Sequence, residues 1–339
     1  MDLLVLLNYI LEQESPRQTI DEFYERYGIK LEQEISRYQL YSSVAKAAKD
    51  RINLSELQHI TPSCELELLP KEILFMNYIA GKPINFDIPG YFVFEYNVDF
   101  QQALRKYFLS GYICFGDYIT AVNNLKGEAL KSLLLEYGLS KSGRLKDLRK
   151  RILDNIPTKD LKVRFDKTVF MLTVSGERCL QENSHIIYFH KNKLDISIYD
   201  ADKYKKKHPN ASNKDIAISL LDAKVKKLPK DNYGLYRNIL YNKSKVFKSN
   251  NETHNELYYL FCVCFVDYID YRVGGKKDMS FSPYAPAIID RIKKIVEKST
   301  ISVSCLRALF SSSIQLLDIA YNTSDIDLAF DKIVYEIEK

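Results

Sequence analysis

Basic residues are concentrated between Lys126 and Arg151. Eight lysines and arginines lie in this stretch against three acidic residues, so its net charge of +5 equals the formal net charge of all 339 residues. Ammonium and guanidinium groups displace the cations that condense around nucleic-acid phosphates, and the resulting affinity depends little on base sequence. The residues expected to form this contact are Lys126, Lys131, Lys141, Ser142, Gly143, Arg144, Lys146, Arg149, Lys150 and Arg151.

Two short amphipathic helices joined by a polar turn would position these residues. The apolar residues at helical spacing are Leu130, Leu133, Leu134 and Tyr137 in the first helix and Leu145, Leu148 and Ile152 in the second. Gly138 is expected to end the first helix, because glycine adopts the left-handed conformation without steric cost. Residues 140–143 supply the turn, with Ser142 or Gly143 as the N-cap of the second helix.

The stretch from Leu125 to Leu153 resembles the SAP motif, a small helix–turn–helix module of many DNA-binding proteins. The family pattern is an aliphatic first helix, a Gly-Leu pair, a polar turn ending in glycine and a basic second helix. The matching residues are Leu125, Leu130, Leu134, Gly138-Leu139, Ser142-Gly143, Leu148 and Arg151-Ile152. The stretch departs from the pattern at Leu145, where the family often has a lysine. The resemblance, over about a tenth of the chain, implies binding to double-stranded DNA with little base specificity.

A second pattern lies at residues 169–180, where an aromatic residue is followed by Leu-Thr-x-x-Gly-x-x-x-Leu. It resembles the step from strand to helix that follows the wing of winged-helix proteins. In that interpretation Thr173 caps a helix that begins near Ser175, and Gly176 allows close packing; the alternative is simply a strand and a capped helix. With the SAP-like stretch before it and Tyr188-x-His190 after it, the pattern is similar to SAP-containing proteins of Gram-positive bacteria and their prophages.

Composition and length fit a globular protein of two or three domains, since 46% of the residues are hydrophobic and 27% are charged. We expect a mainly α protein in which the SAP-like hairpin lies among many helices, with a few short strands that form a wing or a small sheet. The expected parts are an N-terminal mainly helical domain over 1–115, the hairpin over 120–157, a small α/β or winged-helix-like segment over 158–199 and a C-terminal helical domain over 200–339.

Helices are expected in the N-terminal region over 2–14, over 20–27 with Thr19 as a cap, and over 31–51. They would form either a DNA-binding hairpin or a pair that packs or binds a partner. The aromatic run at 91–96 predicts a strand, with a buried loop as the alternative. The helices expected in the C-terminal region are 233–248, 251–272, 286–298, 303–322 and 325–338.

A second set of lysines lies between residues 200 and 230. Its members are Lys203, Lys205, Lys206, Lys207, Lys224, Lys226, Lys227 and Lys230. They would either extend a DNA surface by further phosphate contacts or form the solvated face of a helix and a linker.

No motif of a metal, cofactor or nucleophile site occurs. Cys262 and Cys264 lie in an apolar run and the six cysteines include no Cys-x-x-Cys pair, so buried free thiols are expected. His185 and His190 lie five residues apart, which suits neither a helical nor a strand metal pair. A loop is expected at residues 274–277, which lack the full phosphate-binding pattern. We therefore expect no cofactor and no metal, and we favour a protein without enzymatic activity.

Membrane segments are not expected. The N-terminal apolar run lacks a basic lead-in and is followed by Glu12 and Glu14, unlike a signal peptide. The apolar run 257–269 is interrupted by Asp267 and is too short to cross a bilayer. The cytoplasm is the expected location.

Three functions remain open at this point. The first is a DNA-binding protein of low sequence specificity, whose C-terminal helices mediate self-association or contact a partner. The second is a divergent metal-dependent nuclease or another nucleic-acid enzyme that uses the hairpin for delivery. The third is a protein-interaction module in which the hairpin binds another protein.

Overall fold

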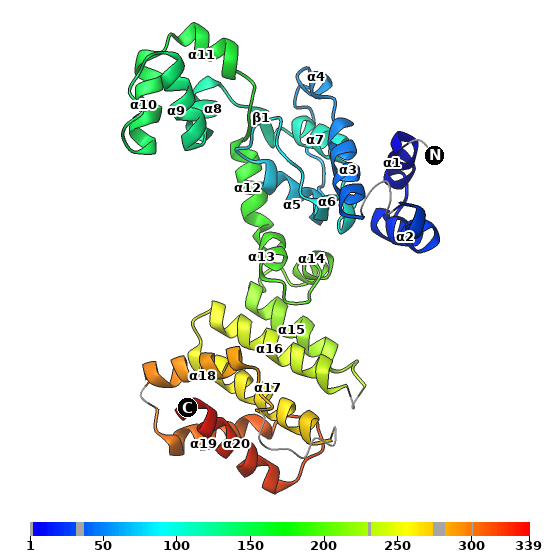
Figure 1. Cartoon of the computed structure of the whole chain (residues 1–339), viewed down its shortest axis with the longest axis vertical. Helices are drawn as coiled ribbons and strands as arrows, with labels where there is room; N and C mark the ends of the chain where they lie inside the picture. The colour runs from blue at the N-terminus through cyan, green and yellow to red at the C-terminus, as the bar shows by residue number, and fades with distance from the viewer. Residues whose placement is uncertain (1–2, 32–36, 230–231, 274–281, 300) are drawn as a thin grey trace. The chain divides into compact units, whose positions relative to one another are not determined.

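The computed structural model describes residues 3–31, 37–229, 232–273, 282–299 and 301–339. In these residues the chain is mainly helical and carries one two-stranded antiparallel sheet (Figure 1). The expected fold class, mainly α with a small sheet, is thereby confirmed. The chain divides into two compact units, Met1–Ile187 and Tyr188–Lys339, so the boundary falls before residue 199 and within the segment expected at 158–199.

The first unit is built from twelve described helices and two strands. They are α1 (Leu3–Leu11), α2 (Pro16–Leu31), α3 (Arg37–Asp50), α4 (Leu54–Leu57), α5 (Pro70–Ile79), α6 (Gly90–Phe94), α7 (Phe100–Leu109), β1 (Ile113–Phe115), α8 (Tyr118–Asn124), α9 (Gly127–Glu136), α10 (Leu145–Asn155), α11 (Thr158–Phe165), β2 (Phe170–Leu172) and α12 (Val174–Glu182). Helix α13 (Ser184–Asn192) spans the boundary between the units.

An aromatic cluster forms the core around α5. The ring of Phe75 lies 5.0 Å from that of Phe100, 5.2 Å from Phe92 and 6.3 Å from Tyr107, measured between ring centroids. Rings at these separations add edge-to-face or tilted contacts to the burial of their apolar area.

The aromatic run at 91–96 is helical up to Phe94 and then turns, so the expected strand is wrong. Helix α6 begins at Gly90, directly after Pro89, and the neighbouring residues Phe92 and Val93 are both buried. A strand would turn these two side chains to opposite faces, whereas the helix lets both enter the core. Tertiary packing therefore overrides the β propensity of aromatic residues here.

The second N-terminal helix starts earlier than expected. Helix α2 begins at Pro16, and the Thr19 hydroxyl donates to the carbonyl of Ser15 at 3.0 Å, so Thr19 lies inside the first turn and is not the cap. Helix α3 begins at Arg37; part of the helix expected over 31–51, residues 32–36, lies outside the described residues.

The sheet joins two strands that are far apart in sequence. Ile113 pairs with Leu172 and Phe115 with Phe170, while helices α8 to α11 lie between the two strands along the chain. At the base of this insertion the Gly116 amide donates to the Val169 carbonyl at 2.9 Å. A wing would join two consecutive strands by a tight turn, so β2 does not belong to a wing. Residues 170–182 form the alternative, a strand followed by a capped helix.

The expected roles of Thr173 and Gly176 are confirmed. Thr173 is the N-cap of α12, and its side-chain oxygen accepts a hydrogen bond from the Gly176 amide at 3.2 Å. The same hydroxyl donates to the carbonyl of Gly111 at 2.5 Å. A Cβ atom on Gly176 would lie 2.1 Å from the carbonyl oxygen of Tyr112, so only glycine allows α12 to approach the segment before β1.

Helices are the only regular elements among the described residues of the second unit, and loops join them. Its helices are α14 (Ile198–Lys207), α15 (Asn213–Val225), α16 (Tyr233–Ser249), α17 (Thr253–Val273), α18 (Pro286–Ser299), α19 (Val303–Ile314) and α20 (Thr323–Glu338). Helices α16 to α20 follow the five expected helices closely except that α19 ends at Ile314 and not at residue 322, and α14 was not expected. The expected loop at 274–277 lies outside the described residues.

Helix α17 carries the core of the second unit. Its apolar run, residues 257–269, is packed by α16, α18, α19 and α20. Asp267 interrupts the run and forms an ion pair with Arg237 of α16 at 2.6 Å. Burial raises the pKa of Asp267 above its ordinary value even though Arg237 opposes this shift. In the ranges that the structure describes, no helix is both long enough and apolar enough to cross a bilayer.

The six cysteines are free thiols, but only two of them are buried. Cys262 and Cys264 lie in the core of α17, as expected, and burial raises the pKa of Cys262 to about 12. Cys64, Cys114 and Cys305 are exposed. The expectation that the cysteines are buried is therefore wrong for these three.

The close approach at Gly176 predicts a large effect of a single methyl group. We expect Gly176→Ala to destabilise the first unit by more than about 2 kcal/mol, because the new Cβ must displace backbone. Gly234→Ala is the control: this glycine lies in the first turn of α16 with no atom within 4 Å of an added Cβ. It should be neutral or stabilising by up to about 1 kcal/mol. Urea unfolding that gives equal stability for both variants would contradict the packing described here.

Candidate nucleic-acid interface

Helices α8 to α11 form a small module with a hydrophobic core of its own. The buried residues of this core are Val122, Leu130, Leu133, Leu134, Leu148, Ile152, Ile156 and Leu161. Helix α9 packs on α10, and α8 packs on both α10 and α11 (Figure 1). The basic stretch thus folds as two helices, as its apolar spacing predicted; its membership of the SAP family remains a prediction.

The turn between α9 and α10 is closed by backbone hydrogen bonds. Gly138 has a φ of +66° just after α9, and the Leu139 amide donates to the Leu134 carbonyl at 2.7 Å. Glycine is therefore the residue that ends this helix, as expected.

The expected N-cap of α10 is wrong. Arg144 is the cap residue, with extended backbone, while Ser142 and Gly143 precede the helix. The Asp147 carboxylate accepts the Arg144 amide at 3.1 Å. Asp147, three residues into the helix, therefore reaches back and satisfies the backbone amide of the cap residue.

Six of the expected cations are exposed on this module. In the described part of the chain none of them forms an ion pair or a hydrogen bond through its charged group. They are Lys126, Lys131, Lys141, Arg144, Lys146 and Lys150. Exposed charges without partners remain hydrated, and they are available to phosphates that approach from solvent.

The second helix separates its charged and apolar faces. Lys146 and Lys150 lie one turn apart, and Leu148 and Ile152, also one turn apart, are buried in the module core. At about 100° per residue, the two lysines point to the side of α10 opposite the core. Two of the three acidic residues of the hairpin have other partners, since Asp147 caps α10 and Glu136 pairs with Arg164 at 2.6 Å.

Two of the expected contact residues have structural roles. Arg151 donates from Nη1 to the carbonyl of Ser140 at 2.5 Å and to that of Ser142 at 2.9 Å. Arg149 is half-buried and donates from Nη2 to the carbonyl of Leu125 at 3.3 Å. Arg151 therefore fastens the turn to α10, and Arg149 fastens the segment that leads into α9. Sequence spacing could not reveal either role, because both depend on the path of the turn.

The turn itself is exposed at Ser142 and Gly143. The hydroxyl of Ser142 lies 2.9 Å from that of Ser140. The module also exposes Lys159 of α11, a cation that follows the basic stretch and was not among the expected contacts. The module thus presents two hydroxyl groups and several cations, and both kinds of group donate hydrogen bonds to phosphate oxygens.

Some lysines of the second set form hydrogen bonds or ion pairs within the protein. Lys205 donates to the carbonyl of Ala211 at 2.8 Å, Lys206 pairs with Asp202 at 3.2 Å and Lys224 with Asp195 at 2.7 Å. Lys203, Lys207, Lys226 and Lys227 are exposed. Lys230 lies outside the described residues. Three of the seven described lysines in this set therefore have partners within the protein, and the choice between a solvated helix face and further phosphate contacts stays a prediction.

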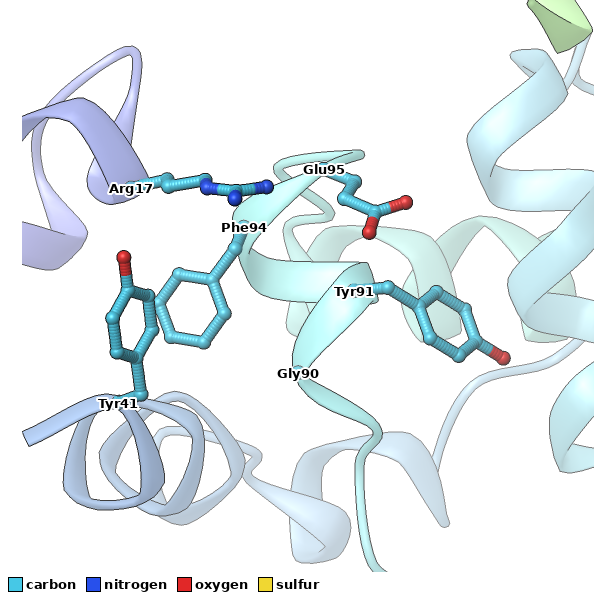
Figure 2. A pocket seen from close by; sticks show the side chains of 6 residues that line it. All are labelled: Arg17, Tyr41, Gly90, Tyr91, Phe94 and Glu95. Carbon is cyan, nitrogen blue, oxygen red and sulfur yellow. The ribbon is translucent and has the colours of Figure 1, made fainter. Parts of the chain in front are cut away.

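The N-terminal helices pack on the rest of the first unit. Helices α2 and α3 contact α6, and the rings of Tyr41 and Phe94 meet edge to face at 4.7 Å. A cavity of about 550 Å³ lies at this junction, where Figure 2 shows Arg17 extending beside Phe94 toward Glu95 and Tyr91 pointing away. One cation and one carboxylate give this cavity no excess charge for phosphate. The contacts favour a packing role for these helices.

No candidate metal site occurs among the residues that the structure describes. No three His, Cys, Asp or Glu side chains lie close enough together there to bind a metal ion. His185 and His190 both lie on α13. Five residues along a helix correspond to about 140° of rotation, so the two imidazoles do not share a helix face.

Arg151 should stabilise the turn, and the adjacent Lys150 supplies a matched control. We expect Arg151→Ala to lower the stability of the module by about 1 kcal/mol, because two charge-assisted hydrogen bonds are lost at a partly exposed site. Amide hydrogen exchange at residues 139–144 should become faster in Arg151→Ala and stay unchanged in Lys150→Ala. Equal exchange in the two variants would show that Arg151 does not hold the turn.

Comparisons with protein-family models, with curated proteins and with solved structures found nothing that matches this chain. The resemblance to the SAP motif therefore depends on the residues of the basic stretch alone. What the module can do follows from its geometry, which presents six cations without partners on the surface of a small helical core.

Proposed function

We propose that the chain binds double-stranded DNA with low sequence specificity through the module of α8 to α11. The observation that carries this proposal is the exposure, without intramolecular partners, of Arg144, Lys146 and Lys150 at the start and along the outer face of α10. Cations in this state release condensed counterions from a phosphate backbone when they bind it. The resemblance to the SAP motif supports the same conclusion.

Low sequence specificity follows from the type of side chain on this face. Lysine ammonium groups act as point charges, and phosphate contacts fix the position of a protein on DNA without reading its bases. Arg149 and Arg151 could form bidentate contacts with guanine, but their guanidinium groups donate to carbonyls of the module. Arg144 is the remaining arginine of the hairpin and lies at the exposed N-cap of α10.

The salt dependence of DNA binding tests this proposal. We expect the triple variant Arg144→Gln, Lys146→Gln, Lys150→Gln to reduce the slope of log K against log salt by about 2 to 3, since each phosphate contact contributes about 0.9. Fluorescence anisotropy with two unrelated duplexes at several salt concentrations measures the slope, and both duplexes should give the same value.

The control for this experiment carries the same change of charge elsewhere. Lys203→Gln, Lys207→Gln, Lys226→Gln removes three exposed cations from the second unit and should leave the slope unchanged. If the slope falls only in this second triple variant, the DNA surface lies on the second unit and the module is not the contact.

We further propose that the second unit supports self-association or a partner contact. Leu328 and Tyr335 of α20 lie two turns apart on one face of the helix, and each is more than half exposed. Sedimentation equilibrium should detect a self-associating species that Leu328→Ser, Tyr335→Ser weakens. Identical monomeric behaviour of both proteins at high concentration would exclude self-association through this face.

A further inference from the structure

The second unit contains a cavity of about 540 Å³ that the DNA proposal does not use. It is bounded by the end of α15, the first half of α16 and the loop after α13. The residues that line it are Asp195, Lys224, Lys227, Leu228, Leu235, Asn238, Ile239, Tyr241 and Asn242. Cavities that hold small organic molecules fall in the range of roughly 300 to 1,000 Å³.

One side of the cavity is apolar. Leu228 follows α15, and Leu235 and Ile239 lie one turn apart on α16. Ile239 is buried, whereas Leu235 is 50% exposed although it lines the cavity. An apolar body placed against Leu235 would remove this side chain from water, at a gain of about 25 cal/mol per Å² of buried apolar surface.

Part of the polar lining already has partners. Lys224 forms an ion pair with Asp195 at 2.7 Å, so these two charges cancel. The Asn242 amide donates to the carbonyl of Leu194 at 3.0 Å and accepts from Lys245 at 3.1 Å. These groups already have partners within the protein and do not need a ligand.

Three other polar groups in the lining have no such partner. Within the described residues, the Lys227 ammonium, the Asn238 amide and the Tyr241 hydroxyl make no hydrogen bond or ion pair with the protein. Lys227 also lies just past the C-terminus of α15, where the helix dipole favours a cation. The lining therefore combines an apolar wall with one uncompensated positive charge and neutral hydrogen-bonding groups.

The carboxylates of Asp195 and Asp222 pair with other lysines and not with Lys227. Asp195 is held by Lys224, and Asp222 of α15 is paired with Lys243 of α16. A single ammonium group matches the single charge of a carboxylate, whereas a dianionic phosphate is usually bound by several donors. The apolar wall also excludes a small inorganic ion as the best occupant, because such an ion would leave Leu228 and Leu235 in water.

We propose that this cavity binds an amphipathic monocarboxylate, a molecule with one carboxylate on an apolar body. The carboxylate pairs with Lys227 and accepts from Asn238 or Tyr241, and the apolar body covers Leu228, Leu235 and Ile239. This binding is independent of DNA, since none of the lining residues belongs to the module of α8 to α11.

Isothermal titration of the full chain with octanoate tests the proposal. We expect one binding site, with affinity reduced at least 10-fold in Lys227→Gln and several-fold in Leu235→Asn. Octanamide, which keeps the apolar body without the charge, should bind at least 10-fold more weakly than octanoate. Butyrate, which keeps the charge on a short body, should also bind more weakly.

Lys226→Gln is the matched control, because Lys226 is exposed, adjacent to Lys227 and absent from the lining. It should bind octanoate as the unchanged protein does, and thermal unfolding should verify that all three variants are folded. Absence of octanoate binding at millimolar concentration would overturn the proposal. Equal binding by Lys227→Gln, or equal binding of octanamide, would overturn it as well.

Discussion

The apolar core shared by α9 and α10 is the feature on which the basic surface depends. Isolated helices of ten or eleven residues are marginal in water, and clustered positive charges repel one another. Burial of Leu130, Leu134, Leu148 and Ile152 offsets both effects, since each such side chain contributes about 1.5 to 3 kcal/mol. Because the core occupies one face of α10, Lys146 and Lys150 are left on the other.

The position of the module in the chain adds a second constraint. Both of its ends are held by the strand pair β1 and β2, with Gly116 bonded to Val169 and the Lys167 amide donating to the Gly116 carbonyl at 3.0 Å. The strand pair closes a long loop, and the entropic cost of closure grows only slowly with loop length. The helices of the insertion have a hydrophobic core of their own, so the chain between the two strands is not a flexible loop. The arrangement lets a charged module be attached without interrupting the aromatic core around Phe75.

Local chemistry explains which predictions from the sequence were correct. Gly138, Thr173 and Gly176 act through neighbours within a few residues or through their own lack of a side chain, so the helix end, the cap and the close approach could be predicted. The long helices α16, α17 and α18 were also found close to their expected bounds, because strong apolar patterns span several turns.

Features that depend on distant residues could not be predicted. Residues 91–96 were expected to form a strand, because the core that receives Phe92 and Val93 comes from other segments. The pairing of β1 with β2 across four helices leaves no local signal. Within the candidate site, the charge of the hairpin was evident from sequence. The division between exposed cations and the structural residues Arg149 and Arg151 depends on the folded turn.

Footprinting of lysines by acetylation, read by mass spectrometry with and without a DNA duplex, tests the central claim most directly. If the module binds the phosphates, duplex DNA will protect Lys126, Lys131, Lys146 and Lys150 from acetylation. Lys203 and Lys207 will keep their reactivity. Protection confined to the second unit, or equal reactivity of every lysine with and without DNA, would contradict a phosphate-binding role for the module.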